Sequence, residues 1–303
     1  MSTQPSRSTV SGRVYLDLQR RAREERKPTQ ELLVRYVHER FLMRLSRSPH
    51  RHRLVLKGGM LLTVFDVRRA TADLDMLARG LDNQTATVTR LVTDIAALDL
   101  DLDDGVGFDI HSIRAEVTRQ DDLYPGVRVH VPTHIATARI PLKLDVNFGD
   151  PVTPAPTEIL YPALLHQPFS LWGYPLVTVL AEKIETMVRR GDANTRERDF
   201  ADVWLLTRVH AVSADDLATA IAATAEHRGT AMTPLAEALS TLPQRRQRAW
   251  SAFVRRAGLE LLPQTFVKVV DDIRLFADPL LAGQVPGRRW NPSGHSWDLT
   301  PGI

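Results

Sequence analysis

The 303-residue chain contains no cysteine. This absence excludes disulfide bonds, thiolate metal sites and a cysteine nucleophile, and it is usual for proteins of the reducing cytosol. No stretch of the sequence approaches the roughly 18 consecutive apolar residues that a transmembrane helix needs. The polar start "MSTQPSRSTVSGR" lacks the apolar segment of a secretory signal. We therefore expect a cytoplasmic protein that has no membrane partner.

Net charge is also small, because 39 lysines and arginines oppose 36 aspartates and glutamates and leave a formal charge of +3. The basic residues are nevertheless clustered. They form four groups: Arg20, Arg21, Arg23, Arg26 and Lys27; Arg44, Arg47, Arg51 and Arg53; Arg189, Arg190, Arg196 and Arg198; and Arg245, Arg246, Arg248, Arg255 and Arg256. Arginine is the preferred bidentate ligand of phosphate, so the groups indicate either a nucleic-acid footprint or ordinary solvated helix faces.

The sequence lacks internal repeats and low-complexity tracts, and its 43% hydrophobic and 25% charged residues are typical of a globular protein. A proline-rich stretch over residues 150–165 separates a first half of mixed patterns from a mostly helical second half. We predict a disordered start over 1–12, a core over 13–160, a helical domain over 161–278 and an irregular end over 279–303. The predicted helices cover 13–25, 29–46, 84–98, 174–190, 195–210, 213–226, 231–240, 244–257 and 262–276.

Three carboxylates lie on predicted strands. In "TADLDML" the alternation of polar and apolar residues puts Asp73 and Asp75 on one side, and Asp145 projects from the polar side of "ARIPLKLDVNFG". Like charges this close repel each other, so they are either solvated or share a cation. An oxygen-rich cluster suits divalent cations that bridge a triphosphate, and the Gly58–Gly59 turn ahead of a helix offers backbone amides to phosphate.

A lysine stands on the apolar side of a predicted helix. In "YPLVTVLAEKIETMVRRG" the apolar residues form one helical stripe, and Lys183 falls near its centre. On the next helix, "TRERDFADVWLLTRVH", Asp199 lies within the apolar stripe and Asp202 lies at its edge. An ammonium group there either reaches solvent or meets an anion. The aspartates could pair with Lys183 structurally or bind a substrate group, and both readings stay open.

The order of a Gly-Gly turn, D-x-D, a third strand carboxylate and a helical lysine resembles the nucleotidyltransferase superfamily. More narrowly, "LKGGMLL", "RRATADLDML", "KLDVNFGD", "LAEKIETMVRRG" and "RERDFADVWLL" are similar to segments of the AbiEii/AbiGii toxin family, which includes the MenT toxins of mycobacteria. The resemblance spans roughly residues 50–210. It implies an α+β fold, in which a nucleotidyltransferase-like mixed sheet flanked by helices is followed by an α-helical C-terminal domain.

The resemblance also implies roles for individual residues. The catalytic set would be Asp73, Asp75, Asp145 and Lys183, in which the three aspartates hold Mg²⁺ or Mn²⁺. The nucleotide would be bound by Lys57, Gly58, Gly59, Arg69, Thr71, Lys183, Asp199 and Asp202. Asp145 would help deprotonate the attacking hydroxyl, Lys183 would contact the β- and γ-phosphates, and either Asp199 or Asp202 would position Lys183. One departure from the wider superfamily is Gly-Gly in place of Gly-Ser, and a second is a slightly long spacer before D-x-D.

The implied reaction is transfer of a nucleoside monophosphate from an NTP to an RNA hydroxyl, most plausibly the 3′ end of tRNA, with release of pyrophosphate. Growth would stop because aminoacylation is blocked, and a separately encoded AbiEi-like antitoxin would restrain the toxin. We expect a monomer. A small-molecule acceptor, as in aminoglycoside nucleotidyltransferases, is an alternative that the arginine groups disfavour. A non-catalytic binding module is another alternative, which the presence of all three carboxylates disfavours.

Overall fold

The computed structural model describes residues 4–67, 69–100, 103–118, 125–259 and 261–299. The chain divides into two units: the first comprises Met1–Val64, Ala70–Gly149 and Thr157–Gly173, and the second comprises Phe65–Arg69, Asp150–Pro156 and Tyr174–Ile303. We expected a single border near residue 160. The chain instead crosses between the units several times, and Thr157–Gly173 groups with the first unit because its strands extend that unit's sheet.

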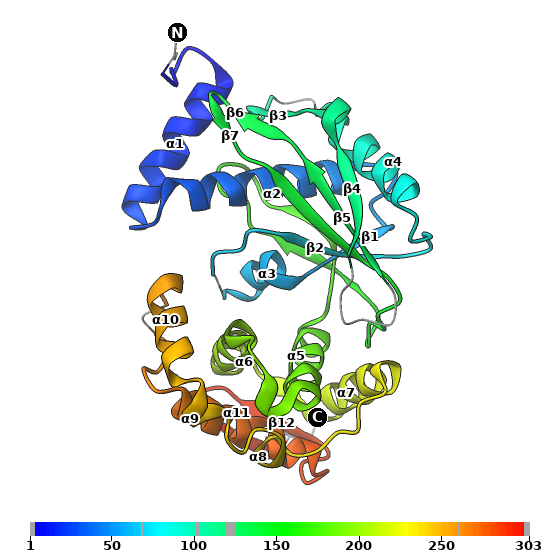
Figure 1. The fold of residues 1–303 in the computed structure, drawn as a ribbon, viewed down its shortest axis with the longest axis vertical. Coiled ribbons are helices and arrows are strands. Elements are labelled where there is room, and N and C mark those ends of the chain that lie inside the picture. Colours follow the sequence, from blue (N-terminus) through cyan, green and yellow to red (C-terminus); the bar gives the residue numbers. More distant parts are fainter. Residues whose placement is uncertain (1–3, 68, 101–102, 119–124, 260, 300–303) are drawn as a thin grey trace. The chain divides into compact units, whose positions relative to one another are not determined.

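The first unit is built on a seven-stranded mixed sheet with the order β4-β5-β8-β2-β1-β10-β9 (Figure 1). Its strands are β1 (Leu54–Lys57), β2 (Leu74–Ala78), β4 (Arg114–Thr118), β5 (Gly126–Val131), β8 (Leu142–Asn147), β9 (Thr157–Tyr161) and β10 (Phe169–Gly173). The pairs β1–β10 and β2–β8 are parallel, and the other neighbouring pairs are antiparallel. A smaller antiparallel sheet joins β3 (Val106–Phe108), β6 (Thr133–Ile135) and β7 (Ala138–Arg139). The predicted mixed sheet is therefore confirmed.

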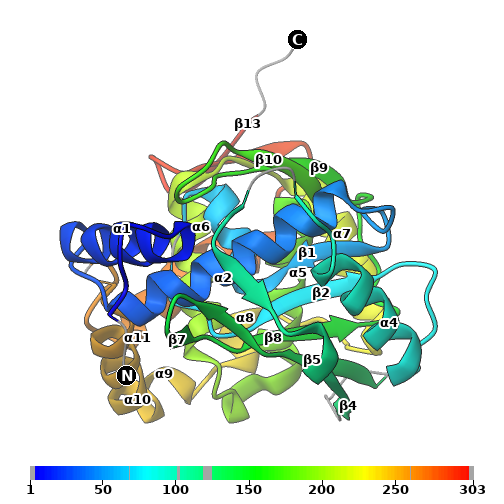
Figure 2. The same ribbon diagram turned by 90° about the horizontal axis from the view of Figure 1, so that it is seen from above.

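One face of the large sheet is apolar and is covered by α2 (Thr29–Arg47) and α4 (Thr85–Ala96), as Figures 1 and 2 show. Alternate residues of β2 and β8, such as Met76 and Leu144, are fully buried on this face. The opposite face carries the polar residues of the same strands. A one-turn helix, α3 (Gly58–Leu61), and a 3₁₀ turn, η1 (Leu62–Phe65), follow β1, and a second 3₁₀ turn, η2 (Ile110–Ser112), precedes β4.

The N-terminal segment is more ordered than the expected disordered start over residues 1–12. Residues 1–3 lie outside the described part of the chain, but α1 (Val10–Glu24) begins within this segment. The Thr9 side chain caps it by accepting a hydrogen bond from the Gly12 amide. That cap, together with burial of Val14 and Leu18, explains the earlier start of the helix.

The second unit is mostly helical, as predicted. Its helices are α5 (Leu176–Arg190), α6 (Glu197–Val209), α7 (Ala214–Arg228), α8 (Leu235–Ala238), α9 (Leu242–Arg245), α10 (Gln247–Ala257) and α11 (Phe266–Leu281), with the 3₁₀ turn η3 (Gly191–Ala193) after α5. The predicted helix over 231–240 is only the single turn α8, because Pro234 stands directly before it. Among the described residues, no helix is both long and apolar enough to cross a bilayer.

The C-terminal segment, which we expected to be irregular, contains two strands. β12 (Arg288–Asn291) and β13 (Ser296–Leu299) form a hairpin, and β12 also pairs with β11 (Val212–Ser213). Trp290 and Trp297 lie opposite each other in the hairpin, and both rings pack on Phe276 of α11 with centroids 4.9 and 5.2 Å away. Cross-strand aromatic pairing on an apolar helix provides the burial that orders this segment.

Candidate functional site

A row of charged residues crosses the polar face of the first unit's sheet. The strand register pairs Lys57 with Asp75, Asp75 with Asp145, Asp145 with Arg128 and Arg128 with Glu116. Paired residues of neighbouring strands project from the same face. From Lys57 to Glu116, the charges along this row are therefore positive, negative, negative, positive and negative. The predicted carboxylates Asp75 and Asp145 lie side by side at the centre of this row.

Asp145 is held by an arginine that the sequence analysis did not single out. Nε and Nη2 of Arg128 donate to Oδ1 and Oδ2 of Asp145, and both distances are 2.7 Å. The hydrogen bonds to Asp145 raise the pKa of Arg128, and the charge of Asp73 adds to this effect. Asp73 therefore acts on the same guanidinium as Asp145. The signal that could have found Arg128 is its polar position in the alternating segment "GVRVHV", on the predicted strand before Asp145.

Gly58 lies against Asp75. Its φ angle is +66°, and a Cβ atom at this position would lie 2.0 Å from Oδ2 of Asp75. The position therefore needs glycine both for its backbone conformation and for the space that it leaves to the carboxylate. The neighbouring Lys57 and Gly59 are buried. Thr71 fixes the chain ahead of β2, because its Oγ1 donates to the Asp73 carbonyl at 3.1 Å.

The second unit contains a separate charged cluster around Lys183 on α5. Its Nζ donates to Oδ1 of Asp199 at 2.9 Å and to Oδ2 of Asp202 at 2.8 Å. Asp202 also accepts from Nε and Nη2 of Arg69 at 2.8 and 3.2 Å, and Asp199 accepts from Nε of Arg196 at 2.6 Å. Three positive charges thus face two negative charges. Positively charged side chains gathered in this way suit a phosphate ligand.

Burial and opposite charges act against each other on the pKa values in this cluster, and the opposite charges prevail. Burial by itself would lower the pKa of Lys183, but the charges of Asp199 and Asp202 outweigh it, and the pKa is raised. Burial would likewise raise the pKa of Asp199, but Lys183 and Arg196 hold it well below its usual range. Lys183 and Asp199 therefore both stay charged at neutral pH. The structural ion pair that the sequence analysis left open is present, and Asp202 shares in it.

The predicted residues fall into two groups. The first unit carries Lys57, Gly58, Gly59, Thr71, Asp73, Asp75 and Asp145, and the second unit carries Arg69, Lys183, Asp199 and Asp202. The segment "RRATADLDML" is divided, because Arg69 belongs to the second unit whereas Thr71, Asp73 and Asp75 belong to the first. Local sequence spacing alone gave no sign of this division.

The carboxylates on the polar face are candidate ligands for a divalent cation. Within the described part of the chain, no three acidic or histidine side chains are grouped to hold a metal ion, and both Asp145 oxygens accept from Arg128. The donor chemistry nevertheless fits, because Asp75 and Asp145 occupy paired positions on parallel strands and supply the oxygen ligands that Mg²⁺ prefers. Gly58 leaves space beside Asp75 that any side chain would fill. These residues supply ligand types that fit a divalent cation, and Arg128 is bonded to both Asp145 oxygens in this structure.

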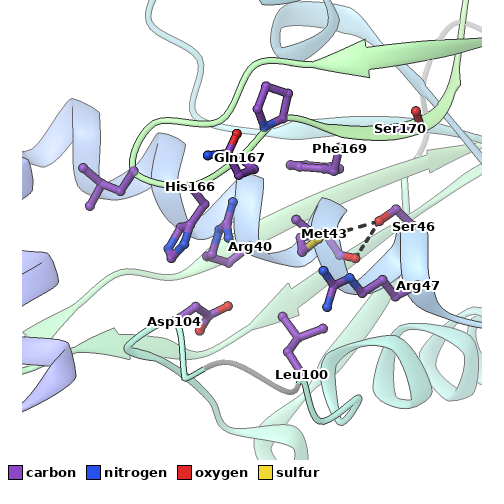
Figure 3. A pocket seen from close by; sticks show the side chains of 12 residues that line it. Arg40, Met43, Ser46, Arg47, Leu100, Asp104, His166, Gln167, Phe169 and Ser170 are labelled. Carbon is purple, nitrogen blue, oxygen red and sulfur yellow. Dashed lines mark hydrogen bonds between the residues drawn. The ribbon is translucent and has the colours of Figure 1, made fainter.

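A cavity of about 700 Å³ lies on the α2 side of the first unit, between α2 and the residues around the start of β10 (Figure 3). Figure 3 shows Arg40 and Met43 of α2 facing His166 and Phe169. Two sets of polar contacts border the cavity. Their bonds are Arg40 to Glu39 at 2.7 Å, Arg44 to Asp104 at 2.6 Å, and the Tyr36 hydroxyl to the Asp104 carbonyl and to His166, both at 2.8 Å. Because Arg44 is buried and paired, it is not available as a surface phosphate ligand.

Comparison with solved structures shows a related fold. The "Crystal structure of JHP933 from Helicobacter pylori" matches with a TM-score of 0.51 and 15% identity, covering 84% of this chain and 94% of that one. The "Crystal structure of putative nucleotidyltransferase from H. pylori" matches with a TM-score of 0.45 and 13% identity, covering 84% and 96%. A search of curated proteins gave no match.

The mixed sheet with its row of carboxylates, followed by a helical unit, is a nucleotidyltransferase-like fold. The profile of the family described as "Nucleotidyl transferase AbiEii toxin, Type IV TA system" matches residues 40–272. The chain belongs to this family of nucleotidyltransferase toxins, as the resemblance in its motifs predicted.

Proposed function

We propose that the protein transfers a nucleoside monophosphate from an NTP to the 3′ end of tRNA, which blocks aminoacylation and growth. Family membership supports the nucleotidyl transfer. The observation that carries the assignment to a site is the pairing of Asp75 with Asp145 next to Gly58. Because the family belongs to type IV toxin–antitoxin systems, the proposal includes a separately encoded antitoxin.

In the proposed reaction, the acceptor hydroxyl oxygen forms a bond to the α-phosphorus of the NTP. The bond from that phosphorus to the oxygen bridging to the β-phosphate breaks, and pyrophosphate leaves. Asp145 accepts the proton of the attacking hydroxyl and passes it to solvent. A divalent cation held by Asp73, Asp75 and Asp145 would neutralise phosphate charge and lower the pKa of the hydroxyl. Asp145 can take this role only after Arg128 has released it.

The proposal assigns the phosphates of the NTP to positively charged and amide groups. Lys183 and Arg69 would bind the β- and γ-phosphates, and the presence of both cationic side chains in one cluster supports this assignment. Asp202 is fully buried and accepts hydrogen bonds from both Lys183 and Arg69, so it would hold these two side chains in place. Backbone amides of Gly58 and Gly59, at the start of α3, would bind phosphate oxygens.

The acceptor would be bound through exposed arginines. Arg47, Arg51 and Arg53 are exposed on the first unit, in contrast to the buried Arg44. If they bind tRNA phosphates, the logarithm of affinity falls steeply with the logarithm of salt concentration, with a slope that reflects several contacts. An affinity that is flat with salt would favour a small-molecule acceptor.

The decisive experiment incubates the protein with each labelled NTP, Mg²⁺ and total tRNA. We expect label at the tRNA 3′ end for wild type and none for Asp75→Asn. Asp99→Asn removes the same charge from an exposed position and serves as the matched control that keeps transfer. Label on a small molecule would move the protein to the aminoglycoside-like class. NTP binding without transfer to any acceptor would leave a non-catalytic binding module.

A further inference from the structure

Arg128 is bonded to both carboxylate oxygens of Asp145, which are the atoms through which Asp145 would bind a metal ion. Both carboxylate oxygens accept from one planar guanidinium at 2.7 Å, which is the strongest geometry for such a pair. A carboxylate engaged in this way keeps only the outward-facing lone pairs of its two oxygens for other ligands. Asp145 can therefore offer its inner, bidentate side to a divalent cation only after Arg128 moves.

The surroundings of Arg128 permit that movement. Its side chain is 33% exposed, whereas that of Asp145 is 6% exposed, so the arginine is the partner that can swing into solvent. A second carboxylate lies near it, because Glu116 on β4 is paired with Arg128 in register and is 65% exposed, and its Oε1 already contacts Nε2 of His130 at 3.3 Å. Arg128 thus lies between two carboxylates, one at the candidate metal site and one on the outer edge of the sheet.

We propose that Arg128 is a displaceable occupant of the metal site, which binds Asp145 in the metal-free protein and moves to Glu116 when a divalent cation binds. This inference rests on the proposed function, because it requires that Asp145 is a metal ligand. The arginine has two effects in the metal-free protein. It neutralises a buried carboxylate that lies beside Asp75, and it competes with the cation for the same oxygens.

Substitutions at Arg128 and at Glu116 should have opposite effects on the affinity for a divalent cation. Arg128→Gln removes the competitor, so the protein should bind Mn²⁺ about tenfold more tightly. Glu116→Gln removes the alternative partner, so binding should weaken about threefold. In the double variant the loss of Glu116 should have no further effect on Mn²⁺ affinity, because the arginine that Glu116 would bind is absent. The probe is Mn²⁺ alone, titrated into the full chain and followed by the electron paramagnetic resonance of the free ion.

Two controls separate displacement from a general effect of charge. Arg114→Gln removes the same charge from the neighbouring strand β4, away from Asp145, and should leave the Mn²⁺ affinity unchanged. Arg128→Lys keeps the charge but loses the bidentate geometry, and should tighten binding about threefold. It also provides a second variant if Arg128→Gln does not fold. In the metal-free state both Arg128 variants should melt at lower temperature, and Mn²⁺ should raise their melting temperature more than that of wild type.

The outcomes distinguish the failure of the switch from the failure of the function. Measurable and equal Mn²⁺ affinity in wild type and both Arg128 variants overturns the switch and leaves the metal site standing. If the effects of Arg128→Gln and Glu116→Gln add up in the double variant, each charge acts on the cation independently at long range. That result also overturns the proposed movement of Arg128. If neither wild type nor any variant binds Mn²⁺, the metal site fails, and the switch fails with it.

Discussion

Among single residues, Gly58 and Gly229 share nearly the same positive φ angle in very different surroundings. Their φ angles are +66° and +63°, but a Cβ atom would lie 2.0 Å from Asp75 Oδ2 at Gly58 and would meet nothing within 4 Å at Gly229. Gly229 ends helix α7 as an ordinary left-handed cap. The pair therefore separates the cost of the backbone conformation from the cost of the clash at the candidate site.

We expect Gly229→Ala to lower the free energy of unfolding by about 1 kcal/mol, the cost of the left-handed conformation. Gly58→Ala should lose at least about 2 kcal/mol more, because Asp75 must move, and it should abolish nucleotide transfer. Urea unfolding of the two variants and of wild type measures the difference. Equal losses in both variants would show that Asp75 has room to move and that Gly58 does not shape the site.

His38 on α2 is a residue whose protonation opposes folding. Its side chain is fully buried, and burial lowers its pKa from 6.5 to about 4. The unfolded chain therefore binds a proton at a higher pH than the folded chain does. The stability that comes from the neutral imidazole is fully present above pH 6.5 and is lost as the pH falls towards 4.

The loss attributable to His38 amounts to about 3 kcal/mol between these two pH values. We expect His38→Leu, which removes the titrating group and two buried nitrogens without hydrogen-bond partners, to reduce the loss of stability in this window. Chemical unfolding at several pH values between 7 and 4 measures the slope. A variant with the wild-type slope would assign the acid sensitivity to other groups, among which His166 acts in the same direction because burial lowers its pKa.

At the scale of elements, the predictable parts are those whose pattern is local. The helices α5 and α6 follow from their apolar stripes, and the position of Asp145 on the polar side of β8 follows from alternation. Strands β9 and β10 were not predicted from the sequence, because "TEILY" and "FSLWG" are short and lie near prolines. They become strands by pairing with each other and, through β10, with β1, at positions distant in sequence. The contact between Arg128 and Asp145 depends on the register of β5 and β8 in the same way.

The β12–β13 hairpin gives an element-scale prediction. Trp297 is buried, stacks on Phe276 and donates from Nε1 to the Phe276 carbonyl at 2.9 Å, whereas Leu299 on the same strand is 74% exposed. Trp297→Ala should lower the free energy of unfolding by about 3–5 kcal/mol. Leu299→Ala should change it by less than about 0.5 kcal/mol. Thermal unfolding followed by circular dichroism measures both, and a small loss for Trp297→Ala would mean that this C-terminal segment is dispensable.

At the scale of the whole molecule, the charged groups of the proposed reaction are divided between the two units. The carboxylates belong to the first unit, and Arg69 and Lys183 belong to the second. Both sets were named from patterns in the sequence, such as strand alternation for the carboxylates and a helical stripe for Lys183. Their part in the reaction remains a prediction. The ion pairs within each set were not predictable to the same degree. Lys183 binds Asp199 and Asp202 together, and each aspartate also binds an arginine.

This sharing makes Lys183 testable. When Lys183→Met removes the ammonium, Asp199 keeps Arg196 and Asp202 keeps Arg69, so neither carboxylate is left without a cation. We therefore expect the variant to fold, with a loss in free energy of unfolding below the roughly 3–5 kcal/mol that breaking a buried pair costs. If Lys183 binds the phosphates, NTP binding in the presence of Mg²⁺ is lost.

The double variant Lys183→Met, Asp199→Asn completes this test by restoring the charge balance of the cluster. A lysine that only neutralises Asp199 becomes unnecessary once Asp199 is neutral, so NTP binding would return. A lysine that contacts phosphate cannot be replaced in this way, and NTP binding would stay lost although the cluster again has one more positive than negative charge. We expect the second result, because the raised pKa keeps Lys183 charged beside the cationic side chains of Arg69 and Arg196. Calorimetric titration of each NTP with Mg²⁺ into wild type and both variants decides between them, and recovery in the double variant would reduce Lys183 to a packing element.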